Sequence, residues 1–141
     1  MHKLIASLLG IIAFVSLAGC TGTTQNQTST NEKQIVNIGI ILPMSGPAST
    51  YGIDALNAYT YVVDQFNASQ SELQIALIVE DGKCEGKDAT SAAQKLITID
   101  KVQAIVGGFC SAETVAAGKI AQQYHIPMLS PASSAPEISD I

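Results

Sequence analysis

The chain has 141 residues, of which 47% are hydrophobic and 13% are charged, so it is long enough for one hydrophobic core but short for two. The net charge is −5, and all seven basic residues are lysines. Nucleic acid is therefore not an expected partner. Without arginine, an anionic ligand must be held by lysine, by hydroxyl groups or by backbone N–H groups.

The N-terminus has the pattern of an export signal. His2 and Lys3 precede an apolar run at residues 4–17, which is followed by Leu-Ala-Gly-Cys at residues 17–20. The run is shorter than the roughly 20 residues that a transmembrane helix needs, which argues against a spanning anchor. The tetrapeptide resembles the lipobox of bacterial lipoproteins. We expect residues 1–19 to be a signal peptide and Cys20 to become a lipidated N-terminus that binds a membrane outside the cytoplasm.

Residues 20–34 are rich in Thr, Asn, Gln and Gly and have no large apolar side chain, which predicts a flexible tether. The glycosylation pattern Asn-x-Ser/Thr occurs at Asn26 and again at Asn67. Because the pattern is short and the chain is rich in Ser and Thr, chance matches explain it equally well.

From residue 35 onward, apolar runs of strand length alternate with segments of helical period. This alternation predicts the α/β class, with a parallel sheet covered by helices on both faces, in a single domain at residues 35–141. The expected strands are Gln34–Leu42, Leu73–Glu80, Val102–Val106 and His125–Leu129. The expected helices cover about residues 53–66, 88–99 and 111–124, with Asp88 capping the second and Val115, Ile120 and Tyr124 of the third available to the core.

Ligands of such sheets gather beyond the carboxyl ends of the strands. The loops expected there are rich in Ser, Gly and Pro and cover residues 43–51, 81–87, 107–111 and 130–136. Glu80, Asp81 and Glu85 cluster on this side, either as solvated loop charge or as a cation site, although the spacing of a calcium loop is missing.

Two cysteines, Cys84 and Cys110, remain beyond Cys20. Both follow the carboxyl ends of consecutive predicted strands, in a compartment that permits disulfides, so a disulfide between the two loops is plausible. Metal binding is the alternative, but Cys-x-x-Cys is absent and His125 is the only histidine after the signal segment.

Several short motifs, in this order and spacing, resemble the type I periplasmic binding proteins of the branched-chain amino acid (Leu/Ile/Val-binding) family. They are Ile-Gly-Ile at residues 38–40, Pro-Met-Ser-Gly-Pro at 43–47, Tyr-Gly at 51–52, Glu-Asp at 80–81 with Cys84, Val-Gly-Gly-Phe-Cys-Ser at 106–111, and Ser-Pro-Ala-Ser-Ser-Ala-Pro-Glu at 130–137. The resemblance implies a Rossmann-like first lobe, with a disulfide between Cys84 and Cys110.

The resemblance also implies ligand-binding residues. Ser111, with Ala112 beside it, corresponds to the residue that holds an amino acid's carboxylate by its hydroxyl and N–H groups. Ala132, Ser133 and Ser134 belong to a loop that holds the ammonium and carboxylate groups, and Tyr51 corresponds to an aromatic residue at the cleft.

Each of these residues also has an ordinary structural explanation. Ser111 could only cap its own helix, Ser133 and Ser134 could be turn residues, and Tyr51 could belong to the core. In favour of binding, Ser111 is expected to open a helix whose N–H groups attract anions.

The function implied by the resemblance is that of an extracytoplasmic, lipid-anchored solute-binding component that delivers amino acids or amides to an ABC permease, without a cofactor or metal. Family members are more than twice as long, so we expect this chain to be a fragment comprising one of their two lobes. The alternative function is a sensory or regulatory lipoprotein that engages a receptor or a cell-wall enzyme. No catalytic residues are expected, because hydrolase and nucleotide-binding motifs are absent and His125 is predicted at the opposite end of the sheet from Ser111.

Overall fold

A computed structural model of the chain describes residues 33–69 and 72–141. The expectations for the signal peptide, for lipidation of Cys20 and for Asn26 concern residues outside the described part, as does the tether up to residue 32. Within the described part, no helix is both long enough and apolar enough to cross a bilayer.

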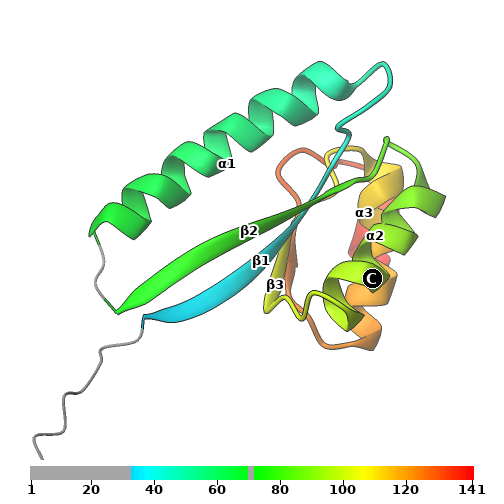
Figure 1. Cartoon of the computed structure of the whole chain (residues 1–141). Helices are drawn as coiled ribbons and strands as arrows, with labels where there is room; N and C mark the ends of the chain where they lie inside the picture. Colours follow the sequence, from blue (N-terminus) through cyan, green and yellow to red (C-terminus); the bar gives the residue numbers. More distant parts are fainter. Residues whose placement is uncertain (1–32, 70–71) are drawn as a thin grey trace, which may run out of the picture. The chain divides into compact units, whose positions relative to one another are not determined.

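The described residues form a parallel sheet with helices on both faces, which confirms the predicted fold class (Figure 1). The strand order is β2-β1-β3-β4, and all neighbours are parallel. The strands are β1 (Gln34–Leu42), β2 (Leu73–Asp81), β3 (Ala104–Gly107) and β4 (Met128–Leu129); the helices are α1 (Ser49–Ser69), α2 (Gly86–Thr98), α3 (Ser111–Gln123) and the 3-10 helix η1 (Pro136–Asp140).

The core lies mainly on the face of the sheet that α2 and α3 cover. Ile41 of β1 and Ile105 of β3 pack there against Leu96 and the small side chains of both helices. A Cβ on Gly39 would lie 2.9 Å from a methyl carbon of Leu96, so glycine at this strand position allows α2 to approach closely.

Helix α1 covers the opposite face of the sheet (Figure 1). Ile38 and Ile40 of β1 point to this face, where they line an apolar cavity of about 260 Å³ together with residues of α1. Packing is looser here than beneath α2, and Val62 of α1 is 63% exposed.

Four details differ from the expectations. Asp88 does not cap α2, because the N-cap is Glu85 and the Asp88 carboxylate pairs with Lys83 at 3.1 Å. Strand β3 begins two residues later than predicted, at Ala104. Gln103 is not part of the strand, although its N–H group donates to the carbonyl of Asn37 at 2.9 Å. Strand β4 is short because Pro127 has no N–H to donate; its carbonyl instead accepts the N–H of Ile105 at 2.9 Å.

The buried stripe of α3 also differs from the predicted one. Thr114, Ala117 and Ala121 are buried, whereas Tyr124 is half exposed and follows the helix as its C-cap. Ile120, in contrast, is partly buried and packs against the core, as predicted.

Candidate functional site

The loops that follow the strands meet at one edge of the sheet, which we call the rim and define as residues 43–51, 81–87, 107–111 and 130–136. Because all four strands run in the same direction, their carboxyl ends lie together. His125 precedes β4 and therefore lies at the opposite end from Ser111, as predicted.

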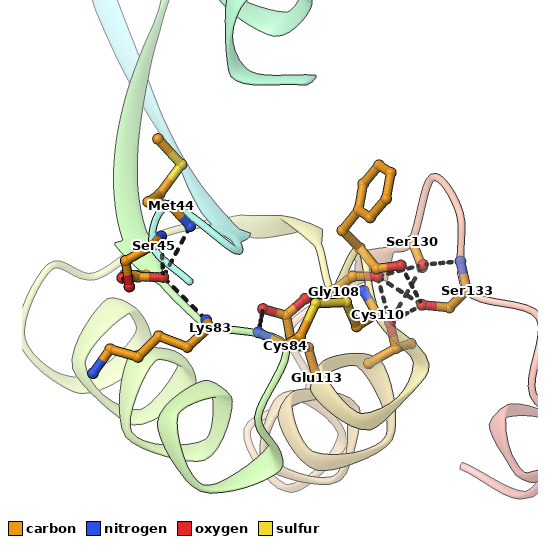
Figure 2. The surroundings of a disulfide bond; sticks show 12 residues. Met44, Ser45, Lys83, Cys84, Gly108, Cys110, Glu113, Ser130 and Ser133 are labelled. Atoms are coloured by element: carbon orange, nitrogen blue, oxygen red, sulfur yellow. Dashed lines mark hydrogen bonds between the residues drawn. A yellow bond between two sulfur atoms is a disulfide. The ribbon is translucent and has the colours of Figure 1, made fainter. Parts of the chain in front are cut away.

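Asp81, the last residue of β2, organises the first loop of the rim. Its carboxylate accepts hydrogen bonds from the N–H groups of Met44 at 2.9 Å and Lys83 at 3.0 Å, and from the hydroxyl of Ser45 (Figure 2). Burial raises the pKa of this carboxyl, but these hydrogen bonds outweigh burial and the pKa lies below its ordinary value. The carboxylate is thus occupied within the protein.

Glu80 and Glu85, the other members of the acidic cluster, do not join Asp81. Glu80 pairs with Lys95 of α2 at 2.6 Å, and Glu85 is an exposed helix cap. The three carboxylates therefore do not share a common ligand position, which fits loop charge better than a cation site.

Cys84 and Cys110 form a disulfide that joins the β2–α2 loop to the β3–α3 loop. Their Cα atoms are 5.2 Å apart, within the usual range for a disulfide. Both sulfurs lie within 4.8 Å of a carboxylate oxygen of Glu113. Sulfurs bonded to each other are not thiolates, so the oxidised pair lacks the ligands of a zinc site.

Ser111 is the first residue of α3, and its hydroxyl turns away from its own helix. The N-cap is Cys110, so the interpretation of Ser111 as a simple N-cap was wrong. The hydroxyl oxygen of Ser111 accepts the N–H groups of Ser134 and Ala135, both at 3.3 Å. Ser111 and Ser134, which lie 23 residues apart in sequence, are thus neighbours on the rim.

Three hydroxyl groups converge on the carbonyl oxygen of Gly108, a cluster that the sequence analysis did not identify. They belong to Thr114 at 2.7 Å, Ser130 at 2.9 Å and Ser133 at 2.7 Å (Figure 2). Ser133, a predicted ligand-binding residue, therefore directs its hydroxyl into the protein, 2.6 Å from that of Thr114.

Gly108 is required for this cluster. Its φ is +70°, and an added Cβ would lie 2.2 Å from the hydroxyl oxygen of Thr114. The Gly-Gly pair before Phe109, together with the serine-rich loop, was the available signal in the sequence, but only the fold brings the two segments together.

The remaining predicted residues lie at the surface of the rim. Tyr51 is 62% exposed, so it does not belong to the core; its ring stacks on Phe109 with centroids 5.9 Å apart. Ala112 and Ala132 are both exposed. Ser111 and Ala112 also line a groove of about 620 Å³ that follows the outer side of α3. Phe109 was not predicted as a site residue.

A parallel sheet with a serine at the start of a helix on one rim suits solute binding, and the family match identifies the class of protein. Residues 35–140 match the model of the periplasmic binding protein family, and the chain belongs to that family. Its structural neighbours are solute-binding proteins of ABC transporters and include branched-chain amino acid binders, which confirms the resemblance noted in the sequence.

Particular relatives can be named. The Leu/Ile/Val-binding protein of Escherichia coli K12 is 29% identical over 127 residues, which are 87% of this chain and 33% of that protein. The substrate-binding protein LivJ of Streptococcus pneumoniae, solved with isoleucine, is 29% identical with a TM-score of 0.72, covering 76% of this chain and 31% of that one.

A third relative binds a different solute. The solute-binding protein of an ABC transporter from Rhodopseudomonas palustris, solved with 3,4-dihydroxybenzoic acid, is 25% identical with a TM-score of 0.69, covering 75% of this chain and 29% of that one. The chain thus spans about a third of the length of the curated relatives it matches.

Proposed function

We propose that this chain is part of an extracytoplasmic, lipid-anchored solute-binding component of an ABC importer for branched-chain amino acids or similar small polar solutes. Its family membership and its similarity to Leu/Ile/Val-binding proteins support this function. The chain corresponds to the N-terminal lobe of such a protein, so a second lobe would supply the opposite wall of the solute site.

The proposal rests mainly on the environment of the Ser111 hydroxyl group. It accepts two N–H groups from the loop after β4, but among the described residues it donates to no acceptor. Its proton therefore remains available, at the start of a helix where unpaired N–H groups favour an anion. Because this chain has no arginine, the arrangement suits the carboxylate end of an amino acid.

The aromatic pair Tyr51 and Phe109 supports a role in binding the other end of the solute. Both rings belong to rim loops, and Tyr51 is largely exposed. An apolar or aromatic side chain of the solute would bury surface against these rings, while its carboxylate lies at Ser111.

The lipid anchor is proposed on sequence grounds, from the tetrapeptide that ends at Cys20. The expected outcome of Cys20→Ser is loss of labelling by a radioactive fatty acid and release of the protein from the membrane fraction. Retention of the label in this variant would contradict the anchor.

The function is tested by a thermal-shift screen of the protein produced from its complete gene without residues 1–19. The screen contains leucine, isoleucine, valine, small amides and 3,4-dihydroxybenzoate, and a solute that binds should raise the unfolding temperature in proportion to the logarithm of its concentration. Ser111→Ala should weaken the binding about 10-fold to 100-fold, because it removes a hydrogen bond to a charged group.

The matched control is Thr98→Ala, which removes an exposed hydroxyl from the last residue of α2, at the opposite end of that helix from the rim. Its affinity should equal that of the wild type. Absence of any stabilisation by amino acids, amides and aromatic acids would contradict the proposed function.

A further inference from the structure

Glu113 is a fully buried acidic side chain that the proposed function does not use. It is 0% exposed and occupies the third position of α3. Buried carboxylates are rare unless they are paired or hydrogen-bonded. None of the three ion pairs among the described residues includes Glu113, so hydrogen bonds must hold its carboxylate.

The two oxygens of the Glu113 carboxylate bind two different rim loops. Oε1 accepts the N–H of Cys84 at 3.0 Å, and Oε2 accepts the N–H of Cys110 at 3.0 Å. Figure 2 shows the carboxylate beside the disulfide, directed at the backbone of both cysteines. The same two residues are therefore joined twice, once through their sulfurs and once through their N–H groups.

The β2–α2 loop needs to be held, because its backbone is strained. Lys83 and Cys84 have φ values of +53° and +59°, in the left-handed region that costs a residue other than glycine about 1 kcal/mol or more. Gly82 leaves the space for the carboxylate, since an added Cβ would lie 2.2 Å from Oε1 of Glu113.

We propose that Glu113 is a positioning residue that fastens the Cys84 and Cys110 loops in parallel with the disulfide, so that the rim stays assembled when the disulfide is broken. Because Cys110 is the N-cap of α3, the carboxylate also fixes the position at which Ser111 begins the helix. The role of Glu113 in holding the two loops is independent of the proposed function. Only its importance for solute binding rests on that function.

The test compares four forms of the whole chain: the wild type and Glu113→Gln, each with the disulfide intact and each reduced. Glutamine keeps the shape of the side chain, but its amide nitrogen cannot accept a hydrogen bond, so one N–H loses its partner. Amide hydrogen exchange at positions 85 and 114, whose N–H groups donate to the carbonyls of Gly82 and Cys110, reports whether the loops are assembled, and amides of β1 serve as the internal reference.

The oxidised variant and the reduced wild type should both keep these amides protected, within about 10-fold of the oxidised wild type. The reduced variant should lose protection at least 10-fold further, with β1 unchanged. Equal protection of the two reduced forms would overturn the proposal, as would loss of protection in the oxidised variant.

A second readout separates positioning from general stability. If Glu113 keeps the reduced thiols side by side, the equilibrium constant for their oxidation by glutathione disulfide should fall about 10-fold in Glu113→Gln; this reaction forms the Cys84–Cys110 bond and releases two molecules of reduced glutathione. Glu85→Gln, which removes an exposed carboxylate next to Cys84, should leave this constant unchanged. An unchanged constant in Glu113→Gln would contradict the role. Neither measurement needs a solute, so their failure would leave the proposed function standing.

Discussion

At the scale of single residues, Asp81 of the rim and Glu113 beside it respond to their surroundings in opposite ways. Hydrogen bonds outweigh burial at Asp81 and lower its pKa, whereas burial dominates at Glu113 and raises its pKa, against the hydrogen bonds from Cys110 and Cys84. The charge of Asp81 adds slightly to the rise at Glu113. Asp81 therefore stabilises the fold when it is charged, and Glu113 is more easily protonated than an ordinary glutamate.

Asp81→Asn should lower the free energy of unfolding by about 1 kcal/mol at pH 7, since hydrogen bonds to a charged but partly exposed group are weakened by solvent. The native pKa lies below the ordinary value of 3.8, so the contribution of Asp81 is present above pH 3.8 and disappears as the pH falls through the native pKa. Urea unfolding between pH 7 and pH 2.5 measures both effects.

The matched control for this prediction is Asp54→Asn, an exposed position of α1. It should leave the free energy of unfolding at pH 7 unchanged. If Asp81→Asn and the wild type differ by the same amount at every pH, the carboxylate is not the stabilising group.

At the scale of elements, the junction between β1 and α1 depends on a glycine inside the helix. Gly52 is buried in the first turn of α1, and an added Cβ would lie 2.2 Å from the carbonyl oxygen of Pro43. Helix α1 can thus start directly over the end of β1 only if this position has no side chain. The Tyr-Gly pair, one of several motifs behind the family resemblance, therefore has a packing reason.

Gly52→Ala is expected to lower the free energy of unfolding by about 1 to 3 kcal/mol, because the backbone carbonyl of Pro43 cannot move away freely. Helix propensity alone predicts a gain of about 1 kcal/mol, so the sign of the change decides between the two effects. Gly118→Ala in α3 is the control, since it meets only the terminal methyl of Ile141 and should be neutral or stabilising.

The free edge of β2 is covered by one side chain of α1. The amide of Asn67 donates to the carbonyl of Ile75 at 2.9 Å and accepts its N–H at 2.8 Å, as a neighbouring strand would. Asn67 is one of the two matches to the glycosylation pattern, but its nitrogen is already engaged in this contact.

Asn67→Ala should therefore destabilise the fold by about 1 to 3 kcal/mol, because a backbone N–H and C=O at the edge lose their partners. Asn57→Ala, at an exposed position of the same helix, should cost nothing. Thermal unfolding of the two variants measures the difference, and equal midpoints would mean that water replaces the amide without loss.

At the scale of the whole molecule, the two faces of the sheet differ in how well they are packed. Beneath α2 and α3 the core is closed, with Leu96 fully buried. Beneath α1 a cavity remains, Val62 is exposed, and at the edge of the sheet Leu129 of β4 is 68% exposed. Stability should come mainly from the α2 and α3 side.

A matched pair of substitutions tests this difference. Leu96→Ala should cost about 3 to 5 kcal/mol, because it empties a closed core, whereas Leu56→Ala in α1 should cost about 1 to 2 kcal/mol, because that side chain is half exposed. Similar losses from denaturant unfolding would show that both faces contribute equally.

The sequence predicted those features that follow from local pattern. Alternating apolar runs placed the strands and helices, and compartment and strand order predicted the Cys84–Cys110 disulfide. Contacts between distant segments could not be predicted, because periodicity says nothing of which loop a side chain meets. Glu113 had the pattern of an ordinary charge in a helix's first turn, and the Gly108 cluster joins residues up to 25 positions apart. Whether Ser111, Ser134 and Tyr51 contact a solute stays a prediction.

One turn at the start of α3 connects three neighbouring loops: Ser111 and Thr114 reach the segment after β4, and Glu113 reaches the segment after β2. Each helical residue rotates the next by about 100°, so inserting or deleting one residue before Ser111 would turn all three side chains away from their partners together. Length variation in related proteins should consequently avoid residues 108–114 and be tolerated instead at the opposite end of the sheet, where no loop depends on a side chain of this turn.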